Sequence, residues 1–288
     1  MSLSNKIDFA LIIDVKNANP NGDPLMGNRP RTDFEGLGEM SDVCLKRKIR
    51  DRLQDAGEEI FVQSDDRKTD DMPSLRHRAE SKDVGLGKDA FTAKADTNET
   101  IKRACEKWFD VRAFGQIFAY KGKGGKGDGV SIPIRGPISL QPAFSTKDVS
   151  ISEVQITKSV SGEVEGNSNK RASDTMGMKY RVDEATYITY GAMNPQLAQR
   201  TGFSDDDAEA IKNVLSRLFE GDASSARPEG SMSVRQVVWW QHNSALGQYS
   251  SAKVHDSLRY LLDDEGKFDA SALSNALDGL QPQIIEGF

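Results

Sequence analysis

The densest group of functional side chains in this sequence is basic, because five of the seven residues from 46 to 52 are Lys or Arg. Guanidinium and ammonium groups on one helix surface bind successive phosphates without reading base sequence. At helical spacing Lys46, Arg47 and Arg50 fall on one flank, so the pattern predicts a helix that binds a polyanion. The alternative is a solvated helix, but Lys46 and Arg50 form a like-charged i, i+4 pair. Arg47 and Asp51 form an oppositely charged i, i+4 pair. We therefore expect the helix to neutralise its own charge only in part, so that self-neutralisation is incomplete.

Two loop aspartates are the candidates for catalysis. Asp23 and Asp33 follow the first predicted strand in a polar loop, where a carboxylate beside bound RNA can assist 2′-hydroxyl attack or help to hold Mg²⁺. Turn and capping roles are the commoner use of loop aspartates, and we expect them here. The three histidines and the two cysteines, Cys44 and Cys105, fit neither metal-ligand nor nucleophile–base spacing. We therefore expect no metal site and no catalytic group.

A glycine pattern at Gly122, Gly124 and Gly127 matches G-x-G-x-x-G, the fingerprint of dinucleotide binding. That fingerprint has to open a helix, whereas here the following residues lead into a strand. The sequence therefore predicts no nucleotide cofactor. The three lysines of this loop fit contact with a phosphate backbone and a solvated loop equally well.

The net charge of the 288-residue chain is −6, which taken whole argues against a nucleic-acid binder. The charge is unevenly distributed, however. Residues 183–288 hold 8 basic and 16 acidic residues, a net of −8, whereas residues 1–182 hold 30 and 28, a net of +2. We therefore expect any polyanion-binding surface in the first two thirds of the chain. No apolar run can span a bilayer and the N-terminus lacks a signal pattern, so we expect a soluble cytoplasmic protein without a membrane partner.

The elements that position these side chains follow from periodicity. Residues 7–15 alternate as a strand with one apolar face, and a turn-rich loop follows. Leu45, Ile49 and Leu53 recur at helical spacing, behind a Ser41 or Asp42 cap. Further elements are helices at 97–108 and 204–221, strands at 130–140, 181–191 and 233–243, and two short C-terminal helices. This order is typical of an α+β fold whose antiparallel sheet is backed by helices.

Two segments look like additions to this fold. Residues 58–96 are polar and highly charged, which indicates a finger-like insertion. Residues 150–181 combine β-type residues with a polar tip and predict a long β-hairpin. Its methionines could be inserted between bases or could simply fill core gaps. The candidate side chains of this hairpin are Lys158, Lys170, Arg171, Met176, Met178, Lys179 and Arg181.

Six separated blocks resemble the backbone subunit of Cascade, the CRISPR surveillance complex, and most closely its subtype I-C branch in the RAMP superfamily. The blocks are IDFALIIDVKNANPNGDP, DVCLKRKIRD, DVRAFGQIFA, IPIRGPISLQPAFS, TMGMKYRV and VWWQHNSALG. The resemblance implies one domain over residues 1–288, with an RRM-like (ferredoxin-like) palm. The helical and loop insertion is then the finger at 58–96, and the β-hairpin at 150–181 is the thumb.

The resemblance also implies a non-catalytic scaffold. Copies would stack head to tail along one CRISPR RNA, joined by other Cascade subunits, in an open heterologous assembly. The guide would pair with a target DNA strand and supply the sequence specificity. The alternative is an RNA endonuclease of the type III backbone kind, which would use Asp33 or Asp23.

The residues that the resemblance places at the RNA lie in three regions. They are Asn17, Asn19 and Asn21 in the loop after the first strand, Lys46, Arg47 and Arg50 on the basic helix, and Lys170, Arg171, Met176, Lys179 and Arg181 in the thumb. RRMs that bind single strands stack bases on sheet aromatics in RNP motifs. This sequence has no such motif, so we expect the RNA backbone to be held and no bases to stack on the sheet.

Overall fold

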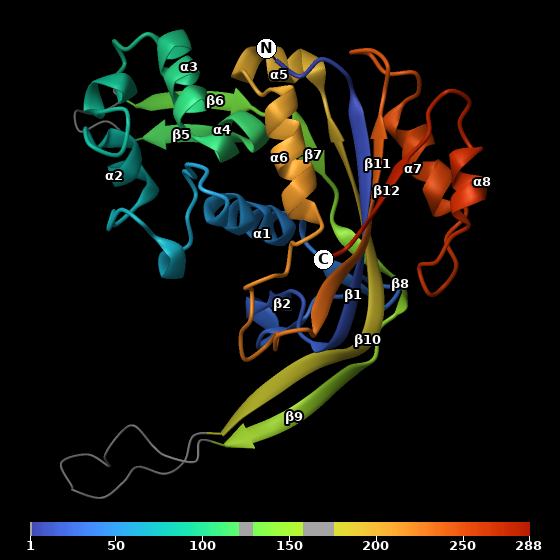
Figure 1. Cartoon of the computed structure of the whole chain (residues 1–288). Coiled ribbons are helices and arrows are strands. Elements are labelled where there is room, and N and C mark those ends of the chain that lie inside the picture. The colour runs from blue at the N-terminus through green and yellow to red at the C-terminus, as the bar shows by residue number, and fades with distance from the viewer. Residues whose placement is uncertain (1, 121–128, 158–175) are drawn as a thin grey trace, which may run out of the picture.

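The computed structural model describes residues 2–120, 129–157 and 176–288. The centre of the fold is an antiparallel sheet (Figure 1). The strand order is β12-β11-β1-β10-β8-β4, and β7 and β9 also pair with β10. The predicted α+β class with an antiparallel sheet is confirmed. The strands of this sheet are β1 (Ile7–Ala18), β4 (Leu37–Met40), β7 (Ile138–Leu140), β8 (Ala143–Asp148), β9 (Ile151–Thr157), β10 (Met176–Met193), β11 (Met232–Gln241) and β12 (Gln283–Glu286).

Strand β1 is the centre of the sheet, between β10 and β11. The sequence predicted one apolar face for this strand, and that prediction is wrong because both faces are buried. Phe9 and Leu11 pack in one hydrophobic cluster, and Ala10 and Ile12 pack in another on the opposite side. The two clusters make this part of the molecule three layers thick.

Two helices cover the first face of the sheet, α1 (Asp42–Asp55) and α6 (Asp205–Leu215). Helix α1 begins at the predicted Ser41 cap, whose Oγ accepts from the Cys44 amide at 3.3 Å. It packs on the sheet through the predicted apolar stripe of Leu45, Ile49 and Leu53. Helix α6 begins with a reciprocal capping box between Ser204 and Asp207, which fixes the start of its acidic first turn.

The opposite face is covered by α7 (Ser251–Arg259) and α8 (Ala270–Ser274), which lie to the right of the sheet in Figure 1. Val254 and Leu258 of α7 and Leu273 of α8 pack on the sheet beside Trp240. No helix among the described residues has both the length and the apolar character needed to cross a bilayer.

The inserted region packs around a cluster of its own. The rings of Phe61 and Trp108 lie 4.7 Å apart between centroids, and Phe118 lies 5.2 Å from both Phe61 and Phe91. This cluster joins the segment around 58–96 to the chain as far as Ile134. Its elements are η2 (Asp65–Arg67), α2 (Leu75–Glu80), η3 (Lys88–Phe91), α3 (Thr97–Lys107), α4 (Phe109–Phe114), β5 (Gly115–Tyr120) and β6 (Val130–Arg135), with α5 (Pro195–Thr201) nearby.

Candidate nucleic-acid interface

The three cations predicted to hold phosphates on α1 each have a carboxylate partner. Lys46 Nζ lies 2.9 Å from Asp42 Oδ2, and Arg47 Nε lies 3.0 Å from Asp51 Oδ2. Arg50 Nε donates to Asp110 Oδ2 at 2.8 Å. Helix α1 therefore neutralises its own charge only in part, as expected, and Asp110 from outside the helix supplies the partner that Arg50 lacks. The Asp42–Lys46 pair lies at i, i+4 spacing and could have been found in the sequence.

The other two cations of the cluster are buried structural groups. Lys48 forms an ion pair with Asp222, and Arg52 Nη2 lies 2.8 Å from Asp55 Oδ2. Burial lowers the pKa of the Lys48 ammonium below its ordinary 10.5, although Asp222 opposes this shift. Charged side chains are rarely buried unless they are paired with an opposite charge. Lys48 and Arg52 therefore stabilise the fold and are not available to bind a phosphate.

Arg47 is the cation of α1 best placed for a ligand. Its side chain is 48% exposed, against 22% for Lys46 and 14% for Arg50. Its second acidic contact, with Asp66 at 3.3 Å, comes from the exposed η2 segment. A phosphate can compete with this exposed partner at little cost, whereas the first partner, Asp51, is buried. The RNA-binding roles of all three cations stay predictions.

The three asparagines that the sequence placed in the loop after the first strand differ in exposure and role. Asn17 lies within β1 and not in the loop; it is exposed and has a left-handed φ of 54°. Asn19 is buried, and its Nδ2 donates to the Asn28 carbonyl at 2.6 Å. Asn21 Oδ1 accepts from both the amide and the hydroxyl of Ser41 at 2.9 Å. These bonds commit Asn19 and Asn21 to building the loop, while the Asn17 side chain is accessible.

Both candidate catalytic aspartates make turn contacts. Asp23 Oδ1 accepts from the Leu25 amide at 3.0 Å and caps the short helix η1 (Pro24–Met26). Asp33 Oδ1 accepts from the amides of Glu35 and Leu37 at 2.9 and 2.8 Å. The turn and capping roles expected from the sequence are confirmed.

Strand β9 and the first part of β10 form a two-stranded arm, residues 151–157 with 176–182, that projects from the sheet (Figure 1). The sequence predicted a hairpin over residues 150–181 and a separate strand at 181–191. The structure instead shows one strand that starts at Met176 and continues into the centre of the sheet. Lys158, Lys170 and Arg171 lie outside the described residues.

The candidate side chains of the arm lie on opposite faces. Alternation along β10 puts Met176, Met178 and Tyr180 on one side, which we call the Met face. Lys179 and Arg181 lie on the other side, which we call the basic face. The exposed fractions of Met176 and Met178 are 69% and 48%, so core filling, one reading of these methionines, does not apply. The sequence treated these residues as one group, and the strand separates them.

Histidines that are far apart in the sequence converge on a buried carboxylate. Asp8 Oδ2 lies 2.9 Å from His242 Nε2 and 2.7 Å from Lys6 Nζ. His255 Nε2 is 3.1 Å from the Gly191 carbonyl and 3.5 Å from Asp8 Oδ1. Burial pushes the pKa of Asp8 upward, but the hydrogen bonds outweigh it and hold that pKa below 3.8. Sequence reasoning missed this cluster because no local spacing links its members.

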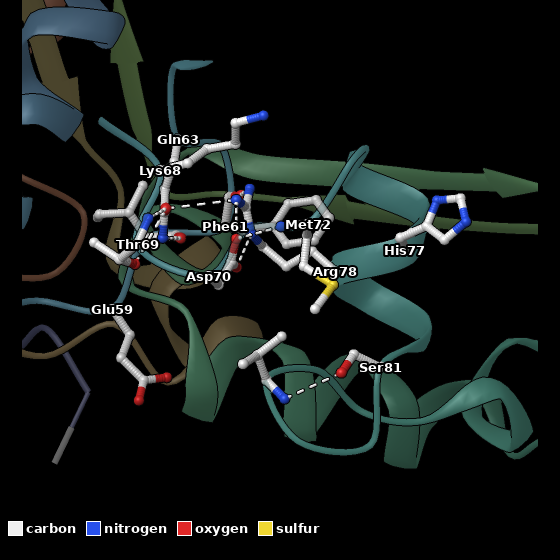
Figure 2. Close-up of polar contacts among 12 residues, drawn as sticks. Glu59, Phe61, Gln63, Lys68, Thr69, Asp70, Met72, His77, Arg78 and Ser81 are labelled. Carbon is white, nitrogen blue, oxygen red and sulfur yellow. Dashed lines mark hydrogen bonds and ion pairs between the residues drawn. The ribbon is translucent and has the colours of Figure 1, made fainter. Parts of the chain in front are cut away.

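A buried arginine holds the inserted region together. Figure 2 shows the Arg78 side chain between Asp70 and Phe61, while His77 points away from them. Arg78 Nη1 donates to the Phe61 carbonyl at 2.6 Å, and its Nη2 donates to Asp70 Oδ1 at 2.8 Å. The Phe61 amide donates in turn to Asp110 Oδ1 at 2.7 Å. Both sides of the Phe61 main chain are thus fixed, and Asp110 links this network to Arg50 on α1.

Comparison with known proteins gives the family. Residues 5–273 match the family described as CRISPR-associated protein Cas7, and the chain therefore belongs to this family. A Cas7 protein of Haloferax volcanii is 26% identical over 290 residues, which covers 96% of this chain and 76% of that protein. The resemblance drawn from the six sequence blocks is thus confirmed at family level, and subtype I-C stays a prediction.

Solved structures with similar chains are described as CRISPR RNA-guided surveillance complexes. One of them, a pre-nicking complex, has a TM-score of 0.48 at 15% identity and covers 94% of this chain and 87% of its own. Another has a TM-score of 0.42 at 15% identity, with coverages of 82% and 68%.

Proposed function

We propose that this protein is the CRISPR RNA-binding backbone subunit of a type I-C Cascade complex. The observation that carries the proposal is the arm with two different faces, which extends from the central strand of the sheet. The basic face suits phosphates, which give affinity without sequence reading. The Met face suits insertion beside bases, as apolar side chains do when they unstack a duplex.

The connectivity supports an RRM-like palm. In chain order β1, α1, β8, β10, α6 and β11 form a β-α-β-β-α-β unit, whose spatial strand order is β11-β1-β10-β8. Its two helices share one face of the sheet. RRMs stack bases on the other face, but here α7 and α8 cover part of that face. This supports a palm that holds the RNA backbone, in agreement with the missing RNP motif.

In this proposal copies of the protein stack head to tail along one guide RNA in the cytoplasm and form a helical filament. Other Cascade subunits complete the assembly, because a heterologous contact by itself leaves open ends. The guide bases stay available for a target DNA strand, so pairing supplies the specificity and the protein reads backbone and shape.

The direct test is the nucleic acid that co-purifies with the protein, together with its salt dependence. We expect a uniform RNA of repeat-plus-spacer length. Changing both Lys179 and Arg181 to Ala should flatten the plot of log affinity against log salt by about 2, one for each phosphate contact. The matched control changes Met176 and Met178 to Ala on the opposite face, which should leave the slope unchanged. Equal slopes for all three proteins would remove the basic face from the interface.

We further propose that the protein is not an enzyme. The support is that the Asp33 and Asp23 carboxylates accept main-chain hydrogen bonds within their own turns. Incubating the assembled complex with complementary RNA and Mg²⁺ should leave the RNA intact, for the wild type and for Asp33→Ala alike. Periodic cuts that appear with the wild type and vanish with Asp33→Ala would establish the endonuclease alternative.

A further inference from the structure

The direction of the arm needs a physical cause. The described part of β9 pairs only with β10, and the arm lies beyond the edge of the packed sheet. Two-stranded ribbons are marginal in water by themselves, and they twist more strongly than wider sheets. A contact from outside the ribbon therefore helps to hold the arm at one angle to the sheet.

Arg29 makes this contact. It lies in β3 (Arg29–Pro30), which pairs with β2 (Gly22–Asp23) in a small hairpin of the loop after β1. Its guanidinium forms an ion pair with Glu153 of β9 and lies 5.5 Å from the centroid of the Tyr180 ring of β10. Glu153 and Tyr180 are direct cross-strand partners. One side chain thus touches both strands of the arm, on its Met face.

The hairpin that carries Arg29 is itself anchored to the palm. The Asn19 bond to the Asn28 carbonyl fixes the residue next to Arg29. Two main-chain bonds continue the anchor, from the Arg31 amide to the Asn21 carbonyl at 3.0 Å and from the Glu39 amide to the Arg31 carbonyl at 2.9 Å. Asn21 then reaches the cap of α1 through Ser41.

The hairpin is also closely packed at the residue that opens it. A Cβ added at Gly22 would lie 2.2 Å from Asn28 Oδ1, so no side chain fits there without moving that asparagine. The buried Asn19 and the half-buried Asn21 thus form a support between the palm and Arg29.

We propose that Arg29 is a latch that sets the angle of the arm, with Asn19 and Asn21 as its support. This inference rests on the proposed function for its consequence: in a filament, the latch fixes where each arm meets the paired guide and target. Arg29 is then a positioning residue and makes no phosphate contact. Its loss should spare guide binding and weaken target-strand binding.

Spin-label distances on the RNA-free chain test the latch directly. The labels go on Val154→Cys, which lies on the basic face away from Arg29, and on Asn213→Cys, which is exposed on α6. Both native cysteines are first replaced, as Cys44→Ser and Cys105→Ala. Arg29→Ala should broaden the distribution of distances between the two labels. The ratio of arms at the angle seen in the structure (docked) to arms at other angles (undocked) should fall about tenfold, because one exposed ion pair and one cation–π contact are lost.

Two further variants sharpen this measurement. Arg29→Lys keeps the charge and should restore part of the narrow distribution. Arg31→Ala removes a neighbouring cation whose partner, Asp23 at 3.7 Å, lies in the same hairpin, so it should leave the distances unchanged. A distribution for Arg29→Ala that matches the wild type overturns the latch.

The RNA measurements separate the latch from the proposed function. With guide-loaded complexes, Arg29→Ala should keep the guide affinity and weaken target-strand binding by up to about tenfold, in proportion to the docked fraction. If Arg29→Ala lowers the guide affinity while the spin-label distances stay unchanged, Arg29 is a phosphate contact and the latch is overturned. A wild-type chain that binds no guide RNA would overturn the proposed function, while the spin-label result would still decide the latch.

Discussion

Changing Arg50 to Ala should lower the free energy of unfolding by about 3–5 kcal/mol, the usual cost of leaving a buried carboxylate without its partner. The carboxylate is that of Asp110, whose side chain is 1% exposed and also accepts from the amides of Phe61 and Val62 at 2.7 and 3.1 Å. Arg50 lies in addition 5.1 Å from the Phe114 ring centroid. The loss would loosen α1 and the inserted region together.

The matched control is Arg47→Ala on the same helix. Arg47 is half exposed, and its buried partner Asp51 keeps a second cation, Arg67 Nε at 3.9 Å, so its loss should cost only about 1 kcal/mol. Urea denaturation measures the difference in the free energy of unfolding between the two variants, and the comparison holds when both free energies fall with urea concentration at the same slope. Equal small losses would mean that Arg50 is not the buried partner of Asp110. Arg47→Ala also tests RNA contact on α1 cleanly, because removing Lys46, Arg47 and Arg50 together would confuse binding with unfolding.

Changing Asp8 to Ala should also cost about 3–5 kcal/mol, because it leaves the buried His242 Nε2 without its partner and Lys6 with only the Tyr249 carbonyl as acceptor. Asp8 is fully buried on β1 and contacts Lys6, which precedes this strand, and His242, which directly follows β11. His255 of α7 approaches the same carboxylate. The charge therefore joins the sheet to the layer of C-terminal helices.

The control for Asp8 is Asp14→Ala on the same strand. Asp14 forms its ion pair with Arg235 near the surface, with Nε donating to Oδ2 at 2.8 Å. Its side chain is more than a third exposed, so its loss should cost less than about 1 kcal/mol. Equal losses for the two variants, measured by urea denaturation, would contradict a special role for the buried cluster.

The contribution of Asp8 should depend on pH with a defined sign. The pKa of this carboxyl lies below its ordinary 3.8 in the folded protein. Its stabilisation is therefore complete above pH 3.8 and is lost as the pH falls through the lower folded pKa. The stability difference between the wild type and Asp8→Ala should shrink over that acidic range. A difference that stays constant below pH 3.8 would contradict the shifted pKa.

Local sequence patterns determined the elements of this protein. The stripe of Leu45, Ile49 and Leu53 and the Ser41 cap predicted α1, and the alternation after Ile7 predicted β1. Six separated blocks resemble the backbone subunit of Cascade, and the match to the Cas7 family confirms this resemblance at family level. These signals are short-ranged, because capping and periodicity act within one or two turns of a helix or a few residues of a strand.

The partners of the charged and polar side chains were decided by the tertiary structure. Arg50 meets Asp110 60 residues away, and Lys48 meets Asp222 174 residues away. Asn19 and Asn21 look like free amides in the sequence but are used within the loop, and the alternation of β10 separates Met176 from Lys179. Only the packing of distant segments brings such groups within hydrogen-bond distance, and burial then requires each charge to be paired. A charge count along the sequence therefore indicated the region of the interface, and the fold decided which of its side chains stay accessible to RNA.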